Sequence, residues 1–128
     1  NMPKLVLIRG WPGSGKTTMA KEMSGFYHVE ADMWFVNNIG EYIFDPTKLQ
    51  QAHDWCHEVA ANHLEMGDDV VVSNTFTRKW EIEKYHQMAK VLGADFEIIE
   101  AKGNFKNTHG VPEEKVQQMK NRMEPYNV

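Results

Sequence analysis

Hydrophobic residues along the chain gather into short apolar runs, and these runs alternate with longer segments of helical periodicity. The runs have the length and composition of buried parallel strands, which read as nearly continuous hydrophobic stretches. They span residues 4–9, 27–30, 70–72 and 96–99. Apolar positions at helical spacing predict helices over residues 16–23, from 47 to 66, from 78 to 92 and from 112 onward.

Local signals mark several helix ends. Thr47 and Gln50 have the spacing of a capping box that opens a helix. Gly93 stands where a helix C-terminus favours glycine, and Pro112 suits the first position of the last helix, where no backbone donor is needed. Residues 33–46 are rich in aromatic side chains but show no clean period. We therefore expect a helical or irregular segment there that lines part of a cleft.

The predicted order is strand, helix, strand, helix, strand, helix, strand, loop and helix. Such alternation favours a three-layer α/β domain around a central parallel sheet. No internal repeat, low-complexity tract or linker interrupts the 128 residues, a length typical of one domain. We therefore expect residues 1–128 to form a single domain.

The composition is that of an ordinary globular protein, with 41% hydrophobic and 25% charged residues. The longest apolar stretches fall well short of the roughly 20 residues that span a bilayer, and no signal segment is apparent, so we expect no membrane partner. The only cysteine, Cys56, excludes an intrachain disulfide and fits a reducing, cytoplasmic location. A formal charge of -4 does not favour strong sequence-independent binding of nucleic acid.

The strongest chemical signal is the segment from Gly10 to Thr17, which matches G-x-x-x-x-G-K-[ST] at every fixed position. Glycines let successive backbone N–H groups converge on phosphate oxygens, and the following helix points its positive dipole end at them. Lys16 would reach the terminal phosphates of a nucleoside triphosphate, and the Thr17 hydroxyl would ligate Mg²⁺. The residues expected to bind the triphosphate are Gly10, Pro12, Gly13, Ser14, Gly15, Lys16, Thr17 and Thr18.

Polar residues follow the predicted strands at the edge of the sheet where α/β proteins bind ligands. Asp32 follows the second strand and could accept a proton from an attacking hydroxyl; a helix N-cap or a surface residue is the alternative. Ser73 and Asn74 end the third strand, where P-loop enzymes place an Asp for Mg²⁺. Their neutral groups could still hydrogen-bond a water on the metal. Arg78 comes next and could bind an acceptor phosphate, with a solvated helix start as the alternative.

The loop after the fourth predicted strand is basic and contains Lys102, Lys106, Asn107 and His109. Such a loop could close over a triphosphate, and Lys106 could neutralise charge that develops in the transition state. Arg122, on the last predicted helix, could assist. A loop that simply faces solvent is the alternative.

These motifs together resemble the small P-loop kinases of the bacteriophage polynucleotide kinase and zeta-toxin-like group. The chain is most similar to an AAA-type ATPase-domain branch that is common in phages and also occurs in animal ubiquitin-ligase-binding proteins. The resemblance runs nearly end to end. It rests on segments 13–18, 52–56, 70–75, 77–81 and 107–112, together with Asp32 and Tyr85.

The resemblance implies a P-loop NTPase fold with a parallel sheet of four to five strands and a basic lid. It also implies transfer of the γ-phosphate of ATP to a hydroxyl, with Lys16 and Thr17 acting on phosphate and Mg²⁺. Asp32 would be the general base, and Lys106 and Asn107 would lie over the nucleotide. The choice of ATP as the nucleotide rests on the resemblance alone.

Three departures distinguish the chain from that family. Ser73 and Asn74 stand where an acidic residue is usual, and Lys106 stands where Arg is usual and cannot make the bidentate fork to phosphate. Asp32 is followed by apolar residues rather than by the Arg that polynucleotide kinases use for the acceptor's phosphate. These departures affect transfer to nucleic acid more than they affect ATP binding.

Three functions are consistent with these patterns. The first is a Mg-ATP-dependent kinase that acts on a nucleotide or a nucleic-acid 5′-hydroxyl, for which the loop and Asp32 argue. The second is a kinase for an uncharged small molecule, favoured by the acidic net charge and the aromatic stretch at 34–44. The third is an ATP-binding module with little turnover that acts as a switch or binds a partner, favoured by the missing acidic residue at Ser73 and Asn74.

Overall fold

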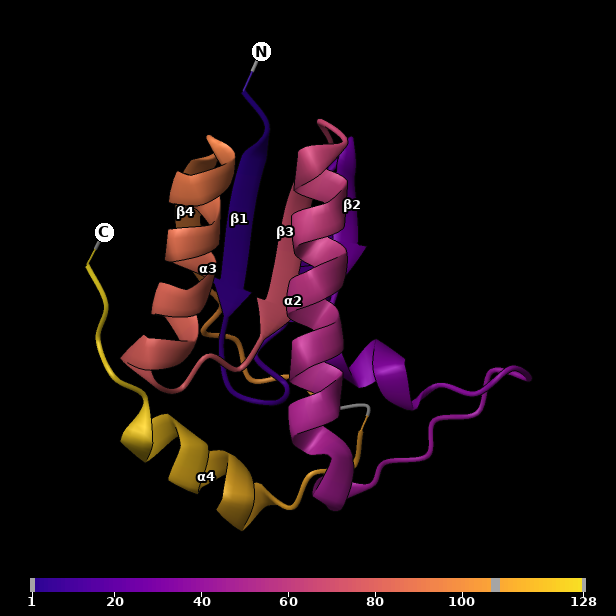
Figure 1. Cartoon of the computed structure of the whole chain (residues 1–128). Helices are drawn as coiled ribbons and strands as arrows, with labels where there is room; N and C mark the ends of the chain where they lie inside the picture. The colour runs from indigo at the N-terminus through magenta and orange to yellow at the C-terminus, as the bar shows by residue number, and fades with distance from the viewer. Residues whose placement is uncertain (1, 107–108, 128) are drawn as a thin grey trace.

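The computed structural model describes residues 2–106 and 109–127 and centres on one parallel sheet (Figure 1). The strands are β1 (Lys4–Arg9), β2 (Phe26–Val29), β3 (Asp69–Asn74) and β4 (Asp95–Glu100), in the spatial order β2-β3-β1-β4. Every neighbouring pair is parallel. The parallel sheet with helices between its strands confirms the predicted α/β fold class.

Burial explains why the central strands are easiest to recognise in the sequence. β1 and β3 lie in the middle of the sheet and are buried at every position after the first. Leu7, in β1, pairs with Val72 on one side and with Ile98 on the other. β4 lies at the edge and is only partly buried. A strand covered on both faces reads as a continuous apolar run, and an edge strand does not.

Helices cover both faces of the sheet and complete three layers. α2 (Leu49–Glu65) and α3 (Lys79–Leu92) pack on one face (Figure 1). α1 (Lys16–Lys21) packs on the other, where Ala20 meets Val6, Ile8 and Val71. The buried residues of α2 recur at helical spacing and are Ala52, Cys56, Ala60 and Leu64. α4 (Glu113–Arg122) lies below the carboxyl ends of the strands and buries only Val116.

Two predicted helix ends are wrong. The side chain of Asp45, rather than a capping box at Thr47 and Gln50, accepts the hydrogen bonds that open this region. It receives the Thr47 N–H at 3.0 Å and the Thr47 hydroxyl at 2.7 Å. A 3₁₀ turn at Pro46–Lys48 then leads into α2, because an Asp before Pro is the better N-cap. Pro112 is the N-cap of α4 rather than its first residue.

Residues 36–45 form an extended arm that projects from the body of the domain (Figure 1). A 3₁₀ helix at Ala31–Phe35 precedes the arm, and an isolated antiparallel bridge joins Val36 to Tyr42. The Asn37 side chain accepts backbone N–H groups and so closes the turn. Ile39 at this turn is 80% exposed. The period-free stretch in the sequence is therefore an irregular segment.

None of the helices in residues 2–106 and 109–127 combines the length and the hydropathy that crossing a bilayer requires.

Candidate functional site

The chain turns sharply after β1, and glycines make this turn possible. Gly13 and Gly15 have φ angles of 84° and 94°, in the left-handed region that glycine enters without strain. A Cβ at Gly10 would lie 2.3 Å from Ser14 Oγ and 2.7 Å from the carbonyl oxygen of Ala101. The spacing of glycines in the motif thus has a steric cause at each of these positions.

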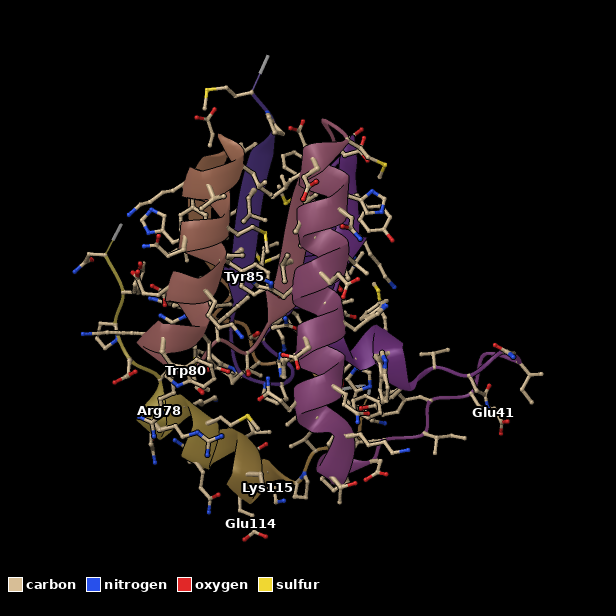
Figure 2. All side chains as sticks on the ribbon, viewed as in Figure 1. Glu41, Arg78, Trp80, Tyr85, Glu114 and Lys115 are labelled. Atoms are coloured by element: carbon tan, nitrogen blue, oxygen red, sulfur yellow. The ribbon has the colours of Figure 1, made fainter. Side chains whose placement is uncertain are left out.

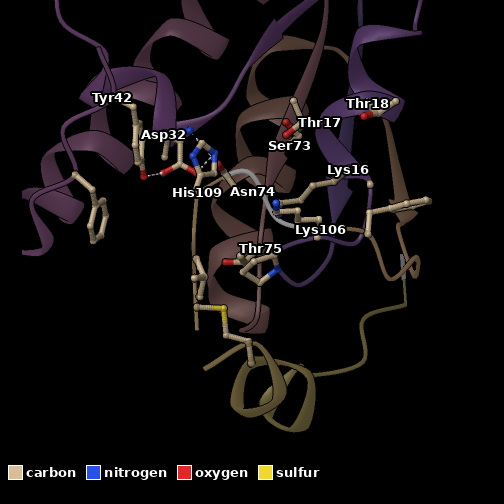
Figure 3. A pocket seen from close by; sticks show the side chains of 18 of the residues that line it. Lys16, Thr17, Thr18, Asp32, Tyr42, Ser73, Asn74, Thr75, Lys106 and His109 are labelled. Atoms are coloured by element: carbon tan, nitrogen blue, oxygen red, sulfur yellow. Dashed lines mark hydrogen bonds and ion pairs between the residues drawn. The ribbon is translucent and has the colours of Figure 1, made fainter. Parts of the chain in front are cut away.

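This loop borders a cavity of about 330 Å³ at the carboxyl ends of the strands, which we call the phosphate pocket (Figure 3). Its walls come from the loop, from the chain just after β2 and β3, from the arm and from the segment after β4. The predicted site residues that line it are Pro12, Gly13, Gly15, Lys16, Thr17, Thr18, Asp32, Ser73 and Lys106. Gly10 and the buried Ser14 shape the loop from behind rather than lining the pocket.

Lys16 brings an amine into this pocket. Burial lowers its pKa, while the negative charges of Glu30 and Asp32 oppose that change. Its Nζ lies 3.5 Å from the carbonyl oxygen of Trp11. Within the described part of the chain, no carboxylate lies within 4 Å of Nζ. A cation held this way is ready for an anionic group such as a phosphate.

A carboxylate that the sequence analysis missed, Glu30, contacts the hydroxyls of both predicted metal residues. Its Oε2 accepts hydrogen bonds from Thr17 Oγ1 at 2.9 Å and from Ser73 Oγ at 2.8 Å. His28 Nε2 lies 2.7 Å from Ser73 Oγ. Because the Ser73 proton goes to Glu30, His28 must donate in this contact. Burial lowers the pKa of His28, which favours the neutral ring.

These oxygens fit a hard divalent cation, which prefers carboxylate and hydroxyl ligands. No group of three or more His, Cys, Asp or Glu side chains in residues 2–106 and 109–127 could hold a metal without help. Mg²⁺ is typically held by only one or two protein groups together with substrate phosphates and waters. The donor set of Thr17, Ser73 and Glu30 therefore suits a metal that arrives with a nucleotide.

Asp32 faces the phosphate pocket but is already engaged by two neighbours (Figure 3). The Tyr42 hydroxyl donates to its Oδ1 at 3.0 Å, and His109 Nε2 lies 3.4 Å from its Oδ2. Burial, followed by the charge of Asp32, raises the pKa of Tyr42 well above its usual value. Tyr42 therefore stays protonated and remains a donor. Neither contact could be read from sequence spacing, because both partners come from irregular segments.

Asn74 holds the backbone near the phosphate pocket and also lines that pocket. Its Oδ1 accepts the backbone N–H of Ala31 at 2.9 Å, and its Nδ2 lies 3.6 Å from Cys56 Sγ. The side chain thereby fixes the turn that follows β2. Nearby, buried Arg9 holds the chain that follows β3: its Nη2 donates to the carbonyl oxygen of Phe76 at 2.7 Å. Phe76 has a φ of 49°, unusual for a residue other than glycine.

The segment after β4 lies directly on the glycine loop. The Gly103 N–H donates to the Ser14 carbonyl at 3.0 Å, and the Phe105 N–H donates to the Gly13 carbonyl at 2.7 Å. Lys106 follows, is exposed and lines the phosphate pocket. The segment after β4 and the glycine loop thus form one joined structure.

Two residues predicted to contact ligands do not line the phosphate pocket, and a third falls outside the described residues. Arg78 is the exposed residue before α3 and does not line the phosphate pocket; Figure 2 shows it at the outer side of the molecule. Arg122 is the exposed last residue of α4, and it is likewise not part of the pocket lining. Asn107 lies outside the described residues.

Sequence comparison relates the chain to one protein family and to two individual proteins. A family described as "AAA domain" matches residues 5–126. A human protein, NEDD4-binding protein 2, is 32% identical over 133 aligned residues, which cover 90% of this chain but only 7% of that protein. An uncharacterised protein of Pasteurella multocida (strain Pm70) is 33% identical over 135 residues, covering 92% of this chain and 75% of that protein.

Comparison of structures finds the same fold in several kinases. A gluconokinase from Sinorhizobium meliloti 1021 matches with a TM-score of 0.64 at 16% identity, covering 98% of this chain and 77% of that one. The APS kinase CysC of Mycobacterium tuberculosis, bound to AMPPNP and APS, gives a TM-score of 0.61 at 16% identity, with 91% and 68% covered. A chain of the Pnkp1/Rnl/Hen1 RNA repair complex matches with a TM-score of 0.65 at 18% identity, covering 93% of this chain and 37% of that one.

Proposed function

Because the chain belongs to the AAA-domain family and has a P-loop kinase-like fold, we propose that it is a Mg-ATP-dependent kinase whose acceptor is the hydroxyl of a nucleotide or of a nucleic-acid 5′ end. The family implies binding of a nucleotide, ATP. The acceptor class draws support from the similarity to a chain of an RNA repair complex. The chain spans only a small part of NEDD4-binding protein 2, so nothing is carried over from that protein as a whole.

One observation carries the proposal: the glycine loop with Lys16 and the carboxylate of Asp32 line the same pocket. In the reaction, an acceptor hydroxyl oxygen bonds to the γ-phosphorus while the bond to the oxygen bridging the β- and γ-phosphates breaks. The hydroxyl proton passes to Asp32, and ADP leaves. Lys16 and the loop N–H groups hold the phosphate oxygens, and Lys106 offsets their charge. Mg²⁺, when bound at Thr17 and Ser73, supplies further charge stabilisation to the phosphates.

Two variants test the assignment of roles. We expect Lys16→Ala to abolish ATP binding and transfer, because it removes the one ammonium group in the loop. We expect Asp32→Asn to keep ATP binding but to slow transfer by roughly 10²- to 10⁴-fold, the usual contribution of a general base. Transfer of labelled phosphate to an oligonucleotide with a 5′-hydroxyl measures activity, and calorimetry measures binding.

Lys21→Ala and Asp54→Asn are matched controls, because both residues are exposed and lie outside the phosphate pocket. Both should behave as the unmodified protein. Transfer that persists in Lys16→Ala and in Asp32→Asn would disprove the proposal.

A second candidate function is a kinase for an uncharged small molecule. Tyr42 and Phe44 of the arm bring aromatic surface into the phosphate pocket. An adjoining cavity of about 250 Å³ lies between α2 and α3 and shares Leu49 and His53 with it; Trp80 lines this cavity too. Largely apolar clefts of this kind suit small ligands. Labelled ATP offered with metabolites and with oligonucleotides separates the candidates, and transfer to oligonucleotides that weakens steeply with salt favours the first.

A further inference from the structure

We infer that Glu30, the residue directly after β2, is the carboxylate of the magnesium site, in place of the acidic residue that the end of β3 lacks. The inference rests on the proposed function and adds a residue to it. P-loop NTPases hold their metal with the loop Ser or Thr and an Asp from a neighbouring strand. Here the loop residue is Thr17, and the third strand ends in two neutral residues, Ser73 and Asn74.

Strand order brings Glu30 to the required position. β2 and β3 are adjacent and parallel, with Val29 opposite Val72. The next residues along the chain are therefore Glu30, directly after β2, and Ser73, within β3. The glutamate side chain reaches across to Ser73, and its Oε2 comes within 2.8 Å of the Ser73 oxygen. A carboxylate thus lies directly behind Thr17 and Ser73, the two hydroxyl residues that line the phosphate pocket.

The hydrogen-bond directions leave the metal-binding lone pairs free. The Thr17 hydroxyl has one proton, and it donates that proton to Glu30 Oε2 at 2.9 Å. Its lone pairs then remain available, and Thr17 lines the phosphate pocket. A hydroxyl that donates to a carboxylate is a better ligand, because the outer partner fixes its orientation and raises its basicity.

The surroundings of Glu30 match a ligand-binding role better than a structural one. Its side chain is only 12% exposed, and its nearest basic partner in the described structure is His28, at 3.8 Å. Within the described residues, no basic side chain lies within hydrogen-bond distance of this carboxylate. Lys16 acts on it only from beyond 4 Å and is the residue expected to bind the phosphates, so the negative charge of Glu30 is placed for a cation that arrives with them. A glutamine could accept the same two hydroxyl protons. Exchanging the carboxylate for an amide therefore removes the charge and keeps the hydrogen bonds.

The experiment compares the binding of a non-hydrolysable ATP analogue with Mg²⁺ and with EDTA, by calorimetry. For the unmodified protein, we expect tighter binding with Mg²⁺. For Glu30→Gln in EDTA, we expect the affinity for the analogue to stay within about twofold of that of the unmodified protein. The increase in affinity on adding Mg²⁺ should fall by roughly 10- to 100-fold, as when other outer-shell partners of a metal are changed. Mn²⁺ electron paramagnetic resonance in the presence of the analogue should show a matching loss of bound metal.

A relocated carboxylate gives the sharpest control. In Glu30→Gln combined with Ser73→Asp, the negative charge moves to β3, and we expect most of the gain from Mg²⁺ to return. Glu58→Gln, an exposed residue of α2, should leave the gain unchanged. Thermal unfolding of each variant checks that it is folded.

The outcomes also separate this inference from the proposed function. If the gain from Mg²⁺ survives Glu30→Gln, or does not return in the double variant, Glu30 is not the metal-site carboxylate, and the kinase proposal still stands. If the unmodified protein binds no analogue with or without Mg²⁺, both are wrong.

Discussion

The thiol of Cys56 lies between α2 and the sheet, fully buried, with the Asn74 amide 3.6 Å from its sulfur. Burial raises the pKa of this thiol. Because the thiolate is the reactive form, both its protonation and its inaccessibility slow reaction. We expect Ellman's reagent at pH 8 to react with the folded protein at least about 100-fold more slowly than with the protein in denaturant, since reaction requires opening of the core.

A variant with an exposed thiol provides the control. Met66 is 66% exposed, so Met66→Cys combined with Cys56→Ala should react quickly without denaturant. Fast reaction of Cys56 in the folded protein would mean that the packing of α2 against the sheet opens readily, and would contradict the burial described above.

At the scale of single residues, the sequence located those pocket residues whose position depends on spacing within one segment. Lys16 and Thr17 are set by a fixed pattern of glycines, and the structure places both at the phosphate pocket. Glu30 could not be found in this way, because its importance depends on β2 lying beside β3. Tyr42 and His109 were missed as partners of Asp32 for a related reason, since each reaches it from a segment without periodicity.

The end of α3 shows how one backbone angle can limit a helix. Gly93 follows the helix with φ of 67°, and nothing lies within 4 Å of the position that a Cβ would occupy. Gly93→Ala therefore tests backbone strain without a steric clash. We expect a loss of about 1 kcal/mol in the free energy of unfolding, since the left-handed conformation costs other residues roughly 1–2 kcal/mol. Chemical denaturation monitored by circular dichroism measures it.

Asparagine tolerates the left-handed region better than alanine. Gly93→Asn should therefore lose less stability than Gly93→Ala. Equal stability of the alanine variant and the unmodified protein would show that the helix end relaxes to another conformation and that its geometry does not depend on glycine.

At the scale of elements, the sequence predicted the strands and helices well where burial dictates the pattern of apolar residues. β1 and β3 are continuous apolar runs, and α3 has apolar residues at helical spacing. The start of α2 was misjudged, because the spacing of Thr47 and Gln50 resembles a capping box while the N-cap is Asp45, two residues earlier. The choice depends on which side chain can accept the free N–H groups once Pro46 has fixed the turn.

At the scale of the whole molecule, the chain after α4 returns to hold the start of α3. Glu124 Oε1 accepts the N–H of Lys79, the first residue of α3, at 2.8 Å, and the Glu124 N–H donates to the Thr77 carbonyl at 2.8 Å. Tyr126 continues the contact by hydrogen-bonding Glu83. No local sequence pattern predicts these contacts, because the partners Lys79 and Glu124 are 45 residues apart.

We therefore expect Glu124→Ala to lower the free energy of unfolding by about 1 kcal/mol, the usual cost of losing a side-chain cap at a helix N-terminus. Glu58→Ala, the same exchange at an exposed site within α2, is the control and should change stability by less than about 0.5 kcal/mol. Urea unfolding followed by tryptophan fluorescence gives both values.

Glu124→Ala also separates the contribution of the chain after α4 to stability from any contribution that it makes to ligand binding. Glu124 is not among the residues that line the phosphate pocket, whereas α4 reaches the glycine loop through Lys120, whose Nζ lies 4.8 Å from the centre of the Trp11 ring. We expect Glu124→Ala to bind the ATP analogue within about twofold of the unmodified protein, because sites without shared contacts act nearly independently. Weaker binding in proportion to lost stability would instead mean that the start of α3 and the phosphate pocket open together.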